Sequence, residues 1–161
     1  MIEAYLSAGS NITPEKNLKL ACMQLAKHYG DLELSPVYRN PAEGFLGDEF
    51  LNMVIGFKTD ESPEQIIERI ELIHKQARRQ RTKDKFSSRT LDLDLLLYGN
   101  EIRRNPKIPH QDIENYGFVA KPLSQIAPKY KHPITGKTML EIWEGFEVAC
   151  SMQEISIGLL D

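Results

Sequence analysis

The alternation of hydrophobic and polar positions divides the first part of the chain into a strand and a long helix. Residues 2–8 are rich in strand-favouring side chains, and they predict a strand that stops at Gly9. Apolar residues then recur at helical spacing, which predicts a helix over 14–29. Thr13 is the expected N-cap of this helix, and Gly30 is the expected stop.

The next part of the chain predicts two strands and a second helix. Residues 32–38 and 50–59 have strand patterns, and a loop over 39–48 with two glycines and a proline separates them. Residues 62–65 (SPEQ) form a capping box with proline at the first helical position. The helix that follows has one apolar stripe, formed by Ile66, Ile70, Ile73 and Ala77.

The clearest strand covers residues 90–98, where leucine alternates with aspartate. After it, prolines interrupt the pattern, and only residues 138–143 predict a brief helix. The order strand-helix-strand-strand-helix-strand predicts an α+β fold of the ferredoxin-like split βαβ type. We expect a mainly antiparallel sheet with helices on one face, a C-terminal extension, and one domain over residues 1–161.

Composition and charge place the chain among ordinary globular proteins. Hydrophobic residues make up 41 % of its 161 residues, and its net charge is −3, which argues against a surface that binds nucleic acid throughout. Cys22 and Cys150 form no disulfide or zinc pattern, so a reducing compartment is the default. The N-terminus has no signal-peptide pattern, and no apolar run approaches ~18 residues. We therefore expect a cytoplasmic protein without a membrane partner.

Two carboxylates share one face of the strand at 90–98. Strand side chains alternate, so Asp92 and Asp94 point to one face, roughly 7 Å apart along the strand, and their leucine neighbours point to the other. Like charges at this separation repel, and a bound cation would relieve the repulsion. Oxygen ligands favour Mg²⁺, which also binds substrate phosphates. The alternative is a solvated pair, or one neutralised by basic neighbours.

A run of cations precedes this strand in a chain that is acidic overall. It is either a solvated or nucleic-acid-binding run, or a cluster that neutralises a polyphosphate. Beside the carboxylates it would complete a phosphoryl-transfer site. There is no Walker motif, so the residues alone predict a Mg²⁺-dependent phosphate-transferring enzyme without a P-loop. The cations are Arg78, Arg79, Arg81, Lys83, Lys85 and Arg89.

The segment KFSSRTLDLDLL at residues 85–96 resembles the signature of the 6-hydroxymethyl-7,8-dihydropterin pyrophosphokinases of folate biosynthesis. The resemblance implies transfer of the β,γ-pyrophosphoryl group of ATP to the hydroxymethyl oxygen of the pterin, with release of AMP. It implies two Mg²⁺ ions, with ATP and the pterin as small-molecule partners. We expect a monomer that binds no nucleic acid. Further matches cover nearly the whole chain, at residues 5–11, 38–41, 50–52, 108–110, 115–118 and 122–128.

The resemblance also implies roles for individual residues. Asp92 and Asp94 would hold the metal ions, while Arg79 and Arg89 would be catalytic and stabilise the charge of the moving group. The nucleotide would be contacted by Arg81, Lys85 and His110, and the pterin by Pro41, Gly44, Phe50, Asn52 and Phe118.

The proposed pterin contacts have a physical rationale. A flat heteroaromatic ring binds between two aromatic faces, here Phe50 and Phe118, and meets in-plane donors and acceptors such as those of Asn52. Without the resemblance, the phenylalanines are equally well core residues, and His110 is a turn residue. Asn52 in an apolar strand is unexplained unless it meets a ligand or backbone. The remaining histidines, His28, His74 and His132, are expected to be surface or packing residues.

Several positions depart from the family pattern. Ser87-Ser88 occupies the place where the family usually has Gly-Pro, and Phe86 replaces a usual tryptophan. Arg78 replaces a usual glycine, and Tyr116 replaces a common arginine. The metal pair and both catalytic arginines are present, so we expect activity. Two alternatives stay open: a pterin or nucleotide binder that has lost catalysis, and an RNA-binding module. The acidic face of the 90–98 strand disfavours the second.

Overall fold

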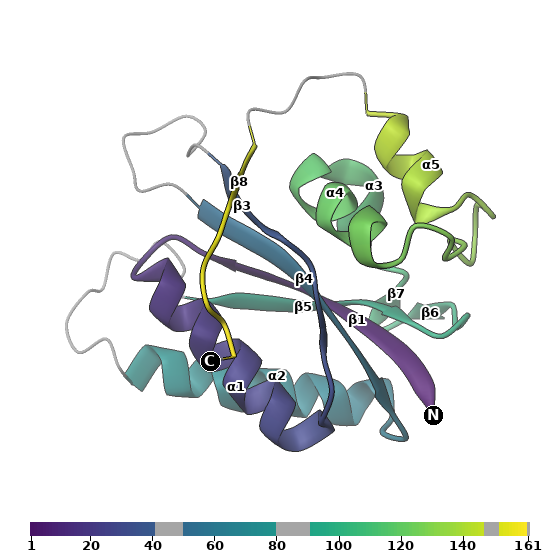
Figure 1. Ribbon diagram of the computed structural model, residues 1–161. Helices are drawn as coiled ribbons and strands as arrows, with labels where there is room; N and C mark the ends of the chain where they lie inside the picture. Colours follow the sequence, from purple (N-terminus) through teal and green to yellow (C-terminus); the bar gives the residue numbers. More distant parts are fainter. Residues whose placement is uncertain (41–49, 80–90, 147–151, 161) are drawn as a thin grey trace.

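Six strands of the described residues form one sheet (Figure 1). They are β1 (Ile2–Ser10), β2 (Glu33–Leu34), β3 (Val37–Asn40), β4 (Phe50–Thr59), β5 (Asp92–Tyr98) and β8 (Gln153–Ile155). The computed structural model describes residues 1–40, 50–79, 91–146 and 152–160. The strand order is β5-β1-β4-β3-β8, with β2 paired to β4, and every pair is antiparallel, as expected.

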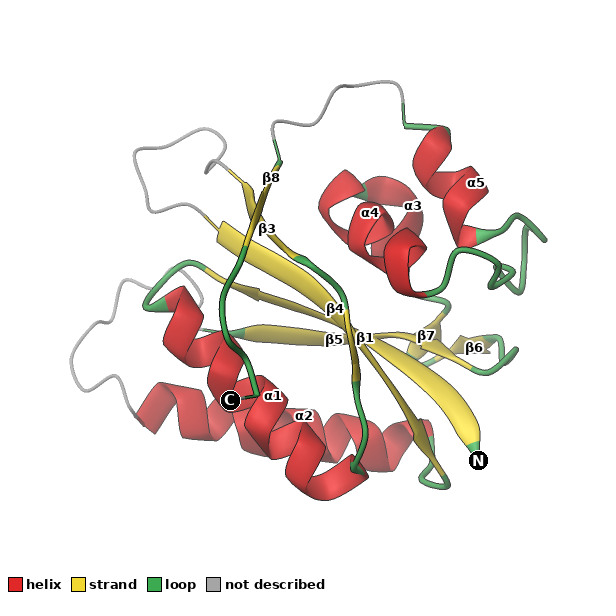
Figure 2. Cartoon of the chain, viewed as in Figure 1, coloured by secondary structure: helices red, strands yellow, loops and turns green. Residues whose placement is uncertain are grey.

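Helices lie on both faces of this sheet (Figure 2). The long helices α1 (Pro14–Tyr29) and α2 (Pro63–Arg79) cover one face, and α4 (Gly117–Ile126) packs on the other face against β3 and β4. Two short helices, α3 (Asp112–Asn115) and α5 (Met139–Glu144), flank α4. The prediction of helices on one face is therefore correct for α1 and α2 and wrong for the C-terminal part.

The alternation of side chains along the strands produces two hydrophobic cores, one on each face. Leu6, Leu18 and Ile66 are fully buried between the sheet and the two long helices. Val54 and Leu123 belong to the second core, under α4. Burial of an aliphatic side chain of this size contributes ~1.5–3 kcal/mol. The second core explains why the C-terminal helices dock on the face opposite α1 and α2.

The two long helices begin differently. The capping box of α2 is confirmed, because the Ser62 N–H donates to Gln65 Oε1 at 2.9 Å and the Gln65 N–H donates to Ser62 Oγ at 3.2 Å. α1 covers the predicted range, and Thr13 occupies its N-cap position as expected, but it does not cap the helix in the usual way. Thr13 has a left-handed backbone, with φ 38°, and its side chain makes no capping hydrogen bond. Its Oγ1 instead lies 3.5 Å from Asn17 Nδ2.

The predicted strand over 32–38 is two strands, separated at Ser35 and Pro36. Proline has no N–H to donate to a ladder, and the Ser35 side chain takes over part of the pairing. The Val54 N–H donates to Ser35 Oγ at 2.8 Å, and the Ser35 N–H donates to the Val54 carbonyl at 3.0 Å. β1 continues through the predicted stop at Gly9, because its pairing with β4 extends to Ser10.

The C-terminal part is richer in structure than its sequence pattern indicated. α5 confirms the brief helix expected near 138–143, whereas α3, α4 and β8 were not predicted. Pro122 lies inside α4, where proline normally breaks a helix; burial of Val119 and Leu123 in the second core accounts for the helix. A small hairpin joins β6 (Arg103–Arg104) to β7 (Lys107–Ile108). Within the described ranges, no helix is long and apolar enough to cross a membrane.

Candidate active site

Strand register brings a carboxylate and a carboxamide onto the same face of the sheet. Asp92 on β5 pairs with Gly9 on β1, and Gly9 pairs with Asn52 on β4. Laterally paired residues of an antiparallel sheet point to the same face. Two strand spacings, about 10 Å, separate Asp92 from Asn52. Because the residue between them is glycine, it places no side chain of its own in this interval.

The predicted alternation along β5 is confirmed at its first residues. Leu91, Leu93 and Leu95 are buried in the core that faces α1 and α2. Asp92 and Asp94 are half-buried and lie on the other face. The two carboxylates therefore project from a rigid strand on the side where α4 packs.

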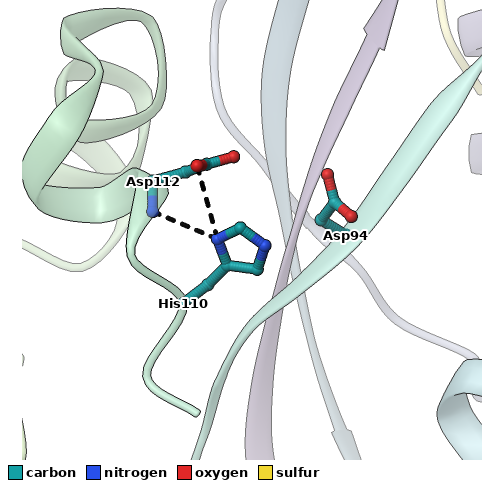
Figure 3. A group of neighbouring side chains, drawn as sticks. All are labelled: Asp94, His110 and Asp112. Carbon is teal, nitrogen blue, oxygen red and sulfur yellow. Dashed lines mark hydrogen bonds and ion pairs between the residues drawn. The ribbon is translucent and has the colours of Figure 1, made fainter. Parts of the chain in front are cut away.

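Asp94 lies in a group of three potential metal ligands with His110 and Asp112 (Figure 3). One ligand atom from each residue lies within 4.8 Å of the others, and all three side chains are half-buried. Asp94 comes from β5, His110 lies in the segment between β7 and α3, and Asp112 is the first residue of α3. Sequence reasoning identified Asp94 and His110 but missed Asp112. The only signal was its position two residues after His110.

Backbone contacts hold His110 beside β5. Its N–H donates to the Leu96 carbonyl at 2.9 Å, on the edge of the strand. The Asp112 N–H donates to His110 Nδ1 at 3.1 Å, and the Asp112 carboxylate lies 3.6 Å from the same nitrogen. When Nδ1 accepts this bond, the proton of the neutral ring is on Nε2. Figure 3 shows that this second nitrogen is directed toward Asp94.

The electrostatic environment of Asp92 and Asp94 favours a bound cation. Burial raises the pKa of Asp94, and the neighbouring charge of Asp92 raises it further. Both effects disfavour the ionised form, and a bound divalent cation would oppose both. The carboxylate oxygens are the ligand type that Mg²⁺ prefers. These residues therefore fit a magnesium site.

Asn52 is the buried polar residue that the sequence left unexplained. It is 8 % exposed on β4, and none of the hydrogen bonds between described residues involves its carboxamide. Asn52 Oδ1 lies over Gly9, so close that a Cβ at position 9 would be 2.8 Å from it. Glycine at position 9 thus permits the observed placement of Asn52, whose donors and acceptor remain available to a ligand.

The two phenylalanines expected to sandwich a pterin lie on the same side of the sheet. Phe50 begins β4 and shares the face of Asn52, and Phe118 lies in the first turn of α4. Both side chains are half-buried. The ring of Phe118 stacks on Tyr116, with centroids 4.9 Å apart and an interplanar angle of 23°. The sandwich itself stays a prediction.

Several predicted site residues cannot be placed. Arg79 is the last residue of α2, and only its backbone is described. The other predicted nucleotide, catalytic and pterin residues outside the described part of the chain are Arg81, Lys85, Arg89, Pro41 and Gly44.

Comparison with known proteins identifies the family. Residues 5–128 match the sequence model of 7,8-dihydro-6-hydroxymethylpterin-pyrophosphokinase (HPPK). The chain belongs to this family. It is 32 % identical to the 2-amino-4-hydroxy-6-hydroxymethyldihydropteridine pyrophosphokinase of Aquifex aeolicus, over 88 % of this chain and 90 % of the relative. The enzyme of the same name from Haemophilus influenzae is 35 % identical, over 79 % of this chain and 82 % of the relative.

The fold is also that of a solved HPPK structure. The crystal structure of wild-type HPPK-DHPS from Plasmodium falciparum superposes with a TM-score of 0.68 at 13 % identity, over 89 % of this chain. The chain spans 44 % of that protein. At this identity the likeness establishes a shared mixed α/β architecture.

Proposed function

We propose that this member of the HPPK family transfers the pyrophosphoryl group of ATP to the hydroxymethyl oxygen of 6-hydroxymethyl-7,8-dihydropterin and releases AMP. One observation carries the proposal. In a chain of this family, Asp92 and Asn52 lie on one face of the sheet, with only Gly9 between them. A metal-bound triphosphate at the carboxylates and a pterin at the carboxamide would thus be neighbours, as a direct transfer requires.

Asp92 and Asp94 would hold Mg²⁺, and we propose two ions. Their ligand type and the raised pKa of Asp94 support this assignment. When bound, the metal would neutralise charge on the phosphate oxygens and on the acceptor oxygen. His110 would donate a hydrogen bond from its Nε2–H to a phosphate oxygen, because its Nδ1 accepts a hydrogen bond from the Asp112 backbone N–H.

The basic residues would share the phosphate charge with the metal. We propose Arg79 and Arg89 as the catalytic cations, on the sequence match alone, since a guanidinium forms paired hydrogen bonds to phosphate oxygens. Arg81 and Lys85 would contact the nucleotide on the same grounds.

The pterin would be bound by one carboxamide and two aromatic faces, with Pro41 and Gly44 as further contacts. Asn52 supplies both in-plane donors and an in-plane acceptor. Tyr116 covers one face of Phe118, so the other face would meet the pterin ring, and the two aromatic side chains would form a stack with it. Phe50 would cover the opposite side of the pterin.

We also propose a finer description of the whole chain. The strand order β5-β1-β4-β3 with two helices on one face supports a ferredoxin-like split βαβ fold, and one sheet shared by both cores supports a single domain. We also propose that the protein acts as a monomer. Use of ATP and the free thiol of Cys22 support a cytoplasmic location.

The direct test is the product of the reaction. We expect purified protein with ATP, Mg²⁺ and 6-hydroxymethyl-7,8-dihydropterin to release AMP in equal amounts with the pterin diphosphate, measured by chromatography. AMP should not appear without the pterin or without metal. Binding of both substrates with no AMP would identify a binder that has lost catalysis. A salt-sensitive mobility shift with RNA, and no ATP binding, would favour the RNA-binding alternative.

Gly9→Ala should weaken pterin binding about tenfold to a hundredfold, since a displaced hydrogen-bonding group costs ~1–3 kcal/mol. The added Cβ would be 2.8 Å from Asn52 Oδ1 and would turn the carboxamide. Calorimetric titration with the pterin measures the effect, and affinity for AMP should not change. Gly56→Ala is the matched control, because its Cβ would be 2.8 Å from Tyr5 on the same pair of strands, away from Asn52. Equal losses of pterin affinity in both variants would contradict the prediction.

A further inference from the structure

His74 connects helix α2 to the strand that carries the two aspartates. It lies in the second half of α2 and is 8 % exposed. Its Nε2 accepts a hydrogen bond from the Leu93 N–H at 2.9 Å. Leu93 lies between Asp92 and Asp94. The expectation that His74 is a surface or packing residue therefore missed a specific polar contact with the metal-binding segment.

The second ring nitrogen determines which tautomer makes this contact. His74 Nδ1 lies 3.1 Å from Glu71 Oε1, one helical turn earlier. A carboxylate only accepts hydrogen bonds, so Nδ1 carries the proton and donates it. Nε2 is then left with the lone pair that the Leu93 amide requires. The ring is thus oriented from both sides and acts as a fixed acceptor.

The location of the Leu93 amide gives this contact its importance. β5 is at the end of the strand order and, within the described residues, pairs only with β1. An N–H on its outer edge has no ladder partner, and a buried N–H without a partner is strongly disfavoured. His74 supplies that partner at the residue between the two carboxylates. Any displacement of the backbone at Leu93 would move both of them.

We propose that His74 is a positioning residue for the metal site: through the Leu93 amide it holds Asp92 and Asp94 at the separation that binds the metal-nucleotide complex. This inference rests on the proposed function for the identity of the metal-nucleotide ligand. Removal of a residue that orients metal ligands without contacting the metal typically weakens metal affinity by ~10–100-fold.

Two substitutions separate positioning from packing. His74→Leu retains apolar bulk but has no acceptor, whereas His74→Gln retains an acceptor oxygen. We expect faster hydrogen exchange of the Leu93 amide in His74→Leu, measured by NMR, and a lesser change in His74→Gln. We also expect Mn²⁺ with α,β-methylene-ATP to bind His74→Leu about tenfold more weakly, with partial rescue in His74→Gln. AMP without metal should bind both variants as it binds the parent protein.

His28→Leu is the matched control, since His28 is a histidine of the other long helix and contacts Glu61 rather than β5. It should bind the manganese complex with parental affinity. The proposal is overturned if His74→Leu binds that complex normally, or if its Leu93 amide exchanges at the parental rate. It is also overturned if AMP and the manganese complex lose affinity equally. Neither binding nor exchange requires turnover, so failure to release AMP would count against the proposed function and not against the role of His74.

Discussion

Asp94→Ala should lose nearly all turnover and still fold. We expect AMP release to fall about a thousandfold, because a bound metal contributes several kcal/mol of transition-state charge stabilisation. The affinity for Mg²⁺-ATP should fall as well. The melting temperature without metal should stay the same or rise, since burial and Asp92 both raise the pKa of Asp94 and disfavour its charged form in the folded protein.

Initial rates, calorimetry with Mg²⁺-ATP and thermal melting of the metal-free protein check these three expectations. Asp60→Ala provides the control, because Asp60 is an exposed aspartate whose contact is the N-terminal amine. It should leave turnover and nucleotide affinity unchanged. Normal turnover in Asp94→Ala would remove the metal assignment, whereas inactivity with loss of the folded state would show a structural role for Asp94.

Asn52→Leu should lose pterin affinity by about a hundredfold and keep its affinity for nucleotide. Leucine has a similar volume, so the packing on β4 is retained, but both donors and the acceptor are removed. The polar edge of a bound pterin would then be left unpaired, and the binding free energy would weaken by ~1–3 kcal/mol for each lost hydrogen bond. Because no hydrogen bond between described residues uses this carboxamide, the variant should melt at or above the parental temperature.

Titration with the pterin, with and without α,β-methylene-ATP, measures the affinity of Asn52→Leu. Asn52→Asp is a useful companion, because it retains an acceptor at nearly the same size and removes the donors. An intermediate loss in that variant would assign part of the affinity to each half of the carboxamide. If Asn52→Leu binds the pterin normally but melts well below the parental protein, Asn52 has a structural role and the pterin assignment is wrong.

Local patterns predicted much of this protein, because they act over a few residues. Period-two alternation placed Asp92 and Asp94 on one face, and the capping box located the start of α2. The failures occurred where long-range packing outweighed local preference. α4 forms despite Pro122, since the second core buries its apolar side, and Ser35 interrupts a predicted strand by bonding to Val54 on β4.

In the candidate site too, local features were predictable from the sequence, whereas long-range contacts were not. The residue types and their spacing predicted a metal pair, a set of cations and a polar residue buried in an apolar strand. The lateral register of β5, β1 and β4, the group that joins Asp94 to Asp112, and the contact of His74 with Leu93 needed the folded chain. Each of these joins segments far apart in the sequence. Such pairings depend on how whole strands and helices pack, which no short window of residues contains.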